Sequence, residues 1–288
     1  MDGQTALGGM AGRRARRRAL RASFVLCIAY AAVVLGAGVF FALYPDAAGT
    51  LVIEKNGFTV DISNATEGYI MMKRENTDKR LKARVIHDAK TTATYNLNGN
   101  GEFEVYPLSL GSGEYEVHGY INVDGDNYAL EMKKKFQVIL PEPDTAFLYP
   151  NTFVSYTPES AAVAKSMELC DGLETDQEKL AKIYDYVSST IMYDYVKAVT
   201  VSANRSYMPD VDETLSTRMG ICFDYSALLA CMLRVQGIPA KLVIGDLIPT
   251  SQYHAWNYAK VDGLWVLLDA TLRNMGYGGK DYAVERFY

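Results

Sequence analysis

The hydrophobic pattern of this 288-residue chain changes its period between residues 140 and 158, and this change limits the folds that the chain can adopt. Before about residue 140, apolar residues alternate over short segments separated by turn signals, whereas after Pro158 they recur at helical spacing. Pro141 and Pro143 lie at the boundary. We therefore predict an α+β protein with two folded domains, over 45–143 and 144–288.

The first of these domains carries the signals of antiparallel strands. Two short segments with the pattern of strands, 51–55 and 58–62, flank Asn56-Gly57, a pair typical of tight hairpin turns. Farther along, residues 115–123 alternate between apolar and polar side chains before another turn. Regular short strands of this kind predict an antiparallel β-sandwich.

The first 44 residues have the composition of a membrane anchor. Six arginines within 1–21 precede 22–44, a run of twenty-three residues without a charge, which is long enough to cross a bilayer. A cleaved signal peptide is the competing interpretation, but its apolar core would be shorter, about 7 to 15 residues. We therefore expect a basic cytoplasmic tail (1–21), one transmembrane helix (22–44) and an extracytoplasmic remainder.

The net charge and the cysteine content limit which partners and which chemistry we expect for the part of the chain after residue 21. Beyond residue 21 the chain has 23 basic and 33 acidic residues, an excess that would repel nucleic acid, so we expect no such partner. The chain has four cysteines, Cys27, Cys170, Cys222 and Cys231, whose spacing does not suggest a disulfide framework. An unpaired thiol is a liability in an oxidising compartment, so a retained one points to a chemical use.

Several other residues could be mistaken for metal ligands. His118 lies on a polar strand face and His87 stands beside Asp88, so we expect locally bonded or solvated histidines. Asp210 and Asp212 do not have the spacing of a hand-shaped calcium loop, and a helix cap explains them better. We predict no metal and no cofactor.

Cys222 occupies the position at which a helix activates a thiol. The run from Cys222 to Gln236 is apolar at helical spacing, and Gly237 followed by Pro239 is a stop signal. Cys222 would therefore lie in the first turn, where free backbone N–H groups and the helix dipole favour a thiolate. Gly220 would let the chain approach the helix closely. Cys231, in mid-helix, is better explained as a buried apolar residue.

The register of a predicted hairpin brings a base and a carboxylate together. If Asp262-Gly263 is a two-residue turn between two strands, His254 and Asp269 lie diagonally on the same face. Diagonal neighbours are roughly 7 to 8 Å apart at the backbone, within reach of an imidazole and a carboxylate. A shift by one residue would place them on opposite faces.

The motifs around these residues resemble the core of the transglutaminase-like superfamily. They are Gly220-Ile-Cys, Gly237-Ile-Pro, Tyr253-His-Ala-Trp and Leu267-Leu-Asp-Ala-Thr. The chain departs from the family pattern at Ala270, where proline is usual, at Lys241, where arginine is frequent, and at Asp246, where an aromatic residue often closes the strand. None of these departures removes a member of the Cys222, His254 and Asp269 set.

The resemblance implies a papain-like Cys-His-Asp triad acting on amide bonds of a protein or cell-wall peptide through a Cys222 thioester. The acyl acceptor stays open, because related domains include hydrolases, cross-linking acyltransferases and proteins without activity. The alternative is a non-catalytic envelope module that uses the same groove for binding.

Overall fold

The computed structural model describes residues 44–202, 207–276 and 279–288. The predicted basic tail and all but the last residue of the predicted membrane span lie outside these ranges. Within them, no helix combines the length and the apolar character needed to cross a membrane.

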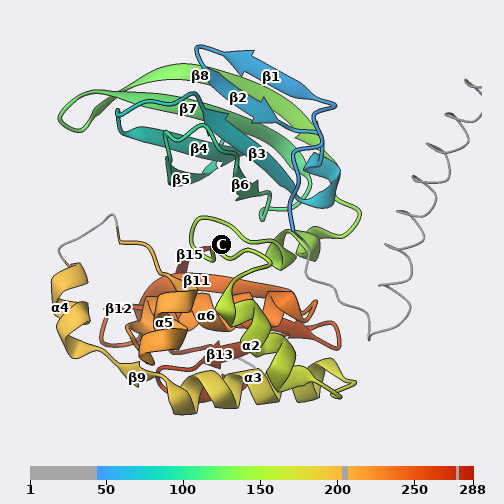
Figure 1. The fold of residues 1–288 in the computed structure, drawn as a ribbon, viewed down its shortest axis with the longest axis vertical. Helices are drawn as coiled ribbons and strands as arrows, with labels where there is room; N and C mark the ends of the chain where they lie inside the picture. The colour runs from blue at the N-terminus through green and yellow to red at the C-terminus, as the bar shows by residue number, and fades with distance from the viewer. Residues whose placement is uncertain (1–43, 203–206, 277–278) are drawn as a thin grey trace, which may run out of the picture. The chain divides into compact units, whose positions relative to one another are not determined.

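Residues 52–138 form two four-stranded antiparallel sheets, drawn in blue to green in Figure 1. The first has the order β1 (Val52–Lys55), β2 (Phe58–Asp61), β3 (Tyr69–Arg74), β6 (Glu104–Pro107). The second has the order β5 (Thr91–Leu97), β4 (Leu81–His87), β7 (Gly113–Asp124), β8 (Asn127–Val138). A short 3-10 helix, η1 (Ala65–Glu67), precedes β3.

The predicted first hairpin is confirmed. Lys55 pairs with Phe58, and the two turn residues have positive φ angles, 50° at Asn56 and 74° at Gly57. A turn with two left-handed residues matches the twist of the flanking strands. The buried faces of the two sheets contribute to one core: Phe58 comes from β2, and Gly119 in β7 lies so close that an added Cβ would fall 2.7 Å from the Phe58 ring.

The C-terminal part combines helices with a five-stranded antiparallel sheet. The sheet has the order β14 (Asn274–Gly276), β13 (Leu264–Asp269), β12 (Gln252–Val261), β11 (Ala240–Leu247), β15 (Tyr282–Phe287). The helices are η2 (Pro143–Leu148), α2 (Ala161–Cys170), α3 (Asp176–Thr190), α4 (Tyr195–Ser202), α5 (Val211–Thr217) and α6 (Cys222–Val235). Two short strands, β9 (Met192–Tyr193) and β10 (Met219–Gly220), pair in parallel, and β10 directly precedes α6.

Helix α6 is the central element of this part, since almost all of its side chains are buried. It starts at Cys222 as predicted, and Gly237 follows its C-cap with φ 77°. Helix α3 differs from its sequence prediction at one residue. Apolar residues at helical spacing after Asp176 predict a helix that Asp176 caps, but the cap is Thr175, whose hydroxyl accepts the Glu178 N–H while the Glu178 carboxylate accepts the Thr175 N–H. Two reciprocal hydrogen bonds outweigh the single bond that a capping aspartate could accept.

The edge strand β15 meets β11 through an irregularity. The pairing shifts register between Ile244 and Gly245. A Cβ on Gly245 would lie 1.9 Å from the backbone oxygen of Ala283, a distance that no side chain tolerates. The glycine therefore allows β15, and with it Tyr282, to lie close to the centre of the sheet.

Candidate active site

Cys222 is the first residue of α6, and the chain just before it packs closely against the start of the helix. A Cβ on Gly220 would lie 2.7 Å from the Asp224 Cβ, so the chain could not approach the helix this way with a larger residue. The Asp224 carboxylate accepts the Ile221 N–H at 2.9 Å and so fixes the residue just before the cysteine. Cys222 is partly exposed, unlike the two buried cysteines of the described residues.

Asp224 is fully buried and has a charged partner. Lys197 of α4 places its Nζ 3.0 Å from Asp224 Oδ2, and the Tyr207 hydroxyl donates to Oδ1. A buried carboxylate beside a nucleophilic sulfur would disfavour a thiolate unless its charge were balanced. Lys197 supplies that balance. The sequence offered no signal for it, because α4 and Tyr207 reach α6 only through the fold.

The predicted hairpin register is confirmed. Asp262 and Gly263 form the turn with φ angles of 51° and 77°, and Val261 pairs with Leu264. The pairing runs to Asn257 opposite Leu268. The same register places Trp256 opposite Asp269, with His254 diagonal to the carboxylate.

His254 and Asp269 meet in the buried interior of the sheet. Their side chains are joined by a hydrogen bond of 2.7 Å between His254 Nε2 and Asp269 Oδ2, and both residues are at least 97% buried. A carboxylate only accepts, so Nε2 carries a proton. Cys222 lies near enough to the imidazole to influence its ionisation. With Nε2 occupied, Nδ1 is the nitrogen available to the sulfur.

The opposing effects on the pKa of His254 together favour its protonated form, the imidazolium. Burial lowers its pKa, but the hydrogen bonds and negative charges of Asp269 and Cys222 outweigh burial and raise the pKa to about 9. A protonated His254 beside Cys222 is the arrangement that supports a thiolate.

Asp269 accepts hydrogen bonds from several groups besides His254. Its Oδ1 accepts the Leu272 N–H at 3.0 Å, and its Oδ2 accepts the Tyr282 hydroxyl at 3.0 Å. The Tyr184 hydroxyl donates to the Asp269 backbone carbonyl at 3.2 Å. Tyr282 was missed in the sequence, because it comes from the strand on the far side of β11.

The other two described cysteines are placed differently. Cys170 and Cys231 are both buried, and burial raises the pKa of Cys170 to about 11 and that of Cys231 further. Cys231 lies in the middle of α6, as predicted.

The remaining candidate ligands are locally bonded. His118 Nε2 lies 2.6 Å from Glu116 and His118 Nδ1 lies 2.8 Å from the Tyr120 hydroxyl. Asp210 caps α5 through the N–H groups of Asp212 and Glu213, as a helix cap should. In the part of the chain that the structure describes, no group of three or more His, Cys, Asp or Glu side chains is arranged to hold a metal ion.

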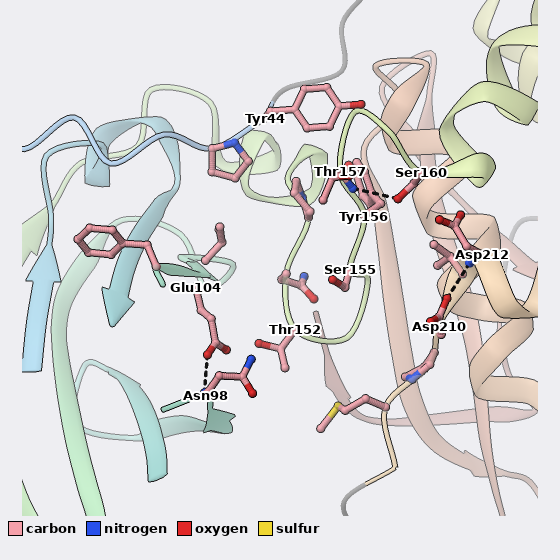
Figure 2. A pocket seen from close by; sticks show the side chains of 18 of the residues that line it. Tyr44, Asn98, Glu104, Thr152, Ser155, Tyr156, Thr157, Ser160, Asp210 and Asp212 are labelled. Atoms are coloured by element: carbon pink, nitrogen blue, oxygen red, sulfur yellow. Dashed lines mark hydrogen bonds between the residues drawn. The ribbon is translucent and has the colours of Figure 1, made fainter. Parts of the chain in front are cut away.

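A cavity of about 910 Å³ lies elsewhere in the protein. Figure 2 shows part of its lining: Glu104 near Asn98 and Thr152, and the start of α5 at Asp210. Cys222, His254 and Asp269 do not line it. The size of this cavity therefore says nothing about the chemistry of the three residues.

Comparison with known proteins identifies the C-terminal segment. A family model described as the transglutaminase-like superfamily matches residues 163–270, which contain Cys222, His254 and Asp269. Comparison with curated proteins gave no match.

Solved structures with similarity to the chain are distant from it. One is a candidate cysteine protease from Cytophaga hutchinsonii, at 12% identity over 83% of both chains with a TM-score of 0.42. A second is LapG from Legionella pneumophila, at 15% identity over 45% of this chain and 84% of LapG, with a TM-score of 0.32. Red sea bream transglutaminase has 10% identity over 70% of this chain and 48% of its own, with a TM-score of 0.23. The assignment rests on the family model: residues 163–270 are a domain of the transglutaminase-like superfamily.

Proposed function

We propose that the chain is a thiol enzyme that transfers an acyl group from an amide of a protein or cell-wall peptide to water or an amine. The observation that carries this proposal is the buried hydrogen bond between His254 and Asp269, with Cys222 near enough to the imidazole to influence its ionisation. A nucleophile, a base and a group that orients the base are the three parts of covalent acyl transfer.

The steps follow from the positions of these groups. The Cys222 thiolate attacks the amide carbonyl, and the Cys222 N–H would donate to the oxyanion, because N–H groups in the first turn of a helix have no intrahelical partner. His254 gives its proton to the leaving amine as the C–N bond breaks, which leaves a thioester. His254 then takes a proton from the acceptor as it attacks, and the thiolate is released. Asp269 holds the imidazole in the required tautomer.

The test of this chemistry is to trap the acyl-enzyme. Incubation with amide and peptide esters, followed by intact-mass measurement, should show one acyl group on Cys222 that hydroxylamine removes. Adding primary amines then distinguishes the acceptors: an amide product indicates transamidation, and the free acid alone indicates hydrolysis. If no peptide or ester acylates Cys222 and peptides still bind, the chain is instead a non-catalytic envelope module.

We further propose that this domain is extracytoplasmic, preceded by a β-sandwich formed by the two sheets of 52–138 and anchored by 22–44. The six arginines before an uncharged run of twenty-three residues support this topology. In intact cells, external protease should digest the C-terminal domain. Digestion only after lysis would contradict this orientation.

A further inference from the structure

The Asp269 carboxylate has more donors than a histidine-orienting group requires. It is fully buried and accepts three hydrogen bonds, two of them on the same oxygen. His254 Nε2 and the Tyr282 hydroxyl both reach Oδ2, at 2.7 and 3.0 Å. Two donors on one oxygen share its negative charge, so a change in one bond alters the other.

The direction of the Tyr282 hydrogen bond is fixed by a neighbour. Asn274 Nδ2 donates to the Tyr282 oxygen at 3.2 Å, so that oxygen is already an acceptor. The single hydroxyl proton of Tyr282 is therefore free to point at Asp269, which can only accept. Burial raises the pKa of Tyr282 to about 12, so the phenol keeps this proton over the physiological range.

Packing holds the Tyr282 ring in place. Its side chain is largely buried, and its ring centroid lies 5.0 Å from that of Trp256, which in turn stacks with the His254 ring at 6.2 Å. Tyr282 comes from β15, whose close approach depends on Gly245 in β11. The same strand pairing thus sets the distance from the phenol to the carboxylate.

Other polar groups around His254 do not duplicate this contact. Cys222 of α6 faces the imidazole itself, and Tyr184 of α3 donates only to the Asp269 backbone carbonyl. Arg273 lies near enough to Tyr184 to influence its ionisation. Within the described ranges, no lysine or arginine forms an ion pair with Asp269.

We propose that Tyr282 is a positioning residue of the site, which fixes the Asp269 carboxylate and limits the negative charge that it presents to His254. The inference rests on the proposed function and deepens it. Without the phenol, more charge remains on Oδ2 and the imidazolium is held more strongly. Tyr282 would thus keep the proton on His254 transferable to a leaving group.

The test is the titration of His254 by ¹⁵N NMR in Tyr282→Phe, measured in the full chain on a Cys222→Ala background so that the thiol does not titrate. The chain has only three histidines, so His87 and His118 serve as internal references. We expect the His254 midpoint to rise by roughly 0.5 to 1 pH unit, the effect of one hydrogen bond to the carboxylate. Tyr184→Phe is the matched control, because it removes a hydroxyl that bonds the backbone of the same residue; its midpoint should not move.

A second variant keeps the proposal open to refutation if Tyr282→Phe does not fold. Asn274 is exposed, and Asn274→Ala removes the donor that strengthens the phenol O–H, so a smaller upward change is expected. An unchanged or lowered midpoint in the folded variants, or an equal rise in Tyr184→Phe, overturns the proposal.

A kinetic measurement separates this inference from the proposed function. With Cys222 present, the pH profile of its alkylation should change in Tyr282→Phe and not in Tyr184→Phe. The titration needs no substrate, so it can succeed even if no acyl-enzyme forms. Conversely, an acyl-enzyme together with an unmoved titration would reject the role of Tyr282 alone.

Discussion

Two histidines of this chain, His118 and His254, each lie near a carboxylate and a tyrosine hydroxyl, but only His254 is a candidate catalytic residue. In the N-terminal sheets, His118 lies between the Glu116 carboxylate at 2.6 Å and the Tyr120 hydroxyl at 2.8 Å. In the C-terminal sheet, Asp269 accepts from both His254 and the Tyr282 hydroxyl. Each cluster combines a histidine, a carboxylate and a tyrosine, but the tyrosine bonds the imidazole in one cluster and the carboxylate in the other.

That difference decides what the second imidazole nitrogen can do. The Tyr120 hydroxyl occupies Nδ1 of His118, whereas His254 has its second nitrogen available for the Cys222 thiol. Glu116 is also shared with Lys133 at 2.5 Å, and Lys133 is half exposed. A histidine–carboxylate pair thus becomes a candidate catalytic pair only when its other nitrogen meets a nucleophile.

The largest expected effect separates the two cysteines of α6. Cys222→Ala should abolish acyl-enzyme formation, because Cys222 is the described thiol that influences the ionisation of His254, whereas Cys170 and Cys231 are buried. Cys231→Ala, nine residues along the same helix, should keep it with a modest loss of stability. Intact-mass measurement after incubation with an activated ester gives the comparison. Acylation that survives in Cys222→Ala would remove the proposed nucleophile.

The second largest expected effect is the difference in turnover between variants of two carboxylates, Asp269 and Glu116. Asp269→Asn should lower turnover by about 10²- to 10⁴-fold, because an amide can hold the wrong imidazole tautomer. Glu116→Gln should leave turnover unchanged, since His118 faces no nucleophile. Steady-state rates on the same substrate test this. A fully active Asp269→Asn would show that His254 needs no orienting group.

Thiol labelling sharpens the contrast between the cysteines. Cys222 should react with iodoacetamide at least about tenfold faster than Cys170 or Cys231, since access and thiolate fraction govern these rates. Burial protects the other two and raises the pKa of both. Peptide mapping after short labelling times measures the order. Equal rates would argue against activation at the start of α6.

Two lysines offer the next comparison, because each pairs with a carboxylate beside one of the clusters. Lys197→Met should slow Cys222 alkylation severalfold and lower the free energy of unfolding by about 1 to 3 kcal/mol, because it leaves the buried Asp224 unpaired. Lys133→Met, which removes the half-exposed partner of Glu116, should change stability by less than about 1 kcal/mol and alkylation not at all. Urea unfolding and timed labelling provide both values. Similar behaviour of the two variants would mean that Lys197 does not balance Asp224.

The smallest expected effect is on the pH dependence of stability. One histidine–carboxylate pair loses its stabilising contribution as pH rises, and the other loses it as pH falls. The folded pKa of His254, about 9, exceeds its ordinary 6.5, so its pairing with Asp269 stabilises fully below 6.5 and loses this effect as pH rises to 9. The hydrogen bonds from His118 and Lys133 lower the pKa of Glu116 from 4.5 to about 2, so its contribution is present above 4.5 and is lost as pH falls to 2.

Urea unfolding of the wild type, Asp269→Asn and Glu116→Gln across this pH range tests both windows. The wild-type advantage over Asp269→Asn should shrink between pH 6.5 and 9, and that over Glu116→Gln should shrink below pH 4.5. Parallel curves would show that neither pair is coupled to folding.

The elements predicted correctly from the sequence are those fixed by local signals. Asn56-Gly57 and Asp262-Gly263 each specify a tight turn, and a two-residue turn leaves one register for the strands beside it. Gly237 likewise ends α6. The error at α3 was also local: Thr175 and Asp176 are both good caps, and the reciprocal bond with Glu178 selects the threonine.

The supporting partners of the site could not be predicted in the same way. Tyr282 reaches Asp269 because β15 pairs with β11 instead of continuing next to β14, and no local pattern specifies that order. Lys197 reaches Asp224 through a helix that the sequence did not connect with the cysteine. Hydrogen bonds between distant segments depend on the packed fold, so they become visible only with the structure.

Because Gly245 has no side chain beyond a hydrogen atom, its close contact with β15 limits which substitutions the protein can accept at this position. A single methyl group there would meet the Ala283 oxygen at 1.9 Å, so alanine would force β15 away from β11. Moving β15 would carry the Tyr282 phenol out of reach of Asp269 without touching any of the three residues that would do chemistry. One of the most restrictive positions for the proposed reaction is therefore a residue with no functional group, and a homologue with a larger residue there would need another way to support its histidine.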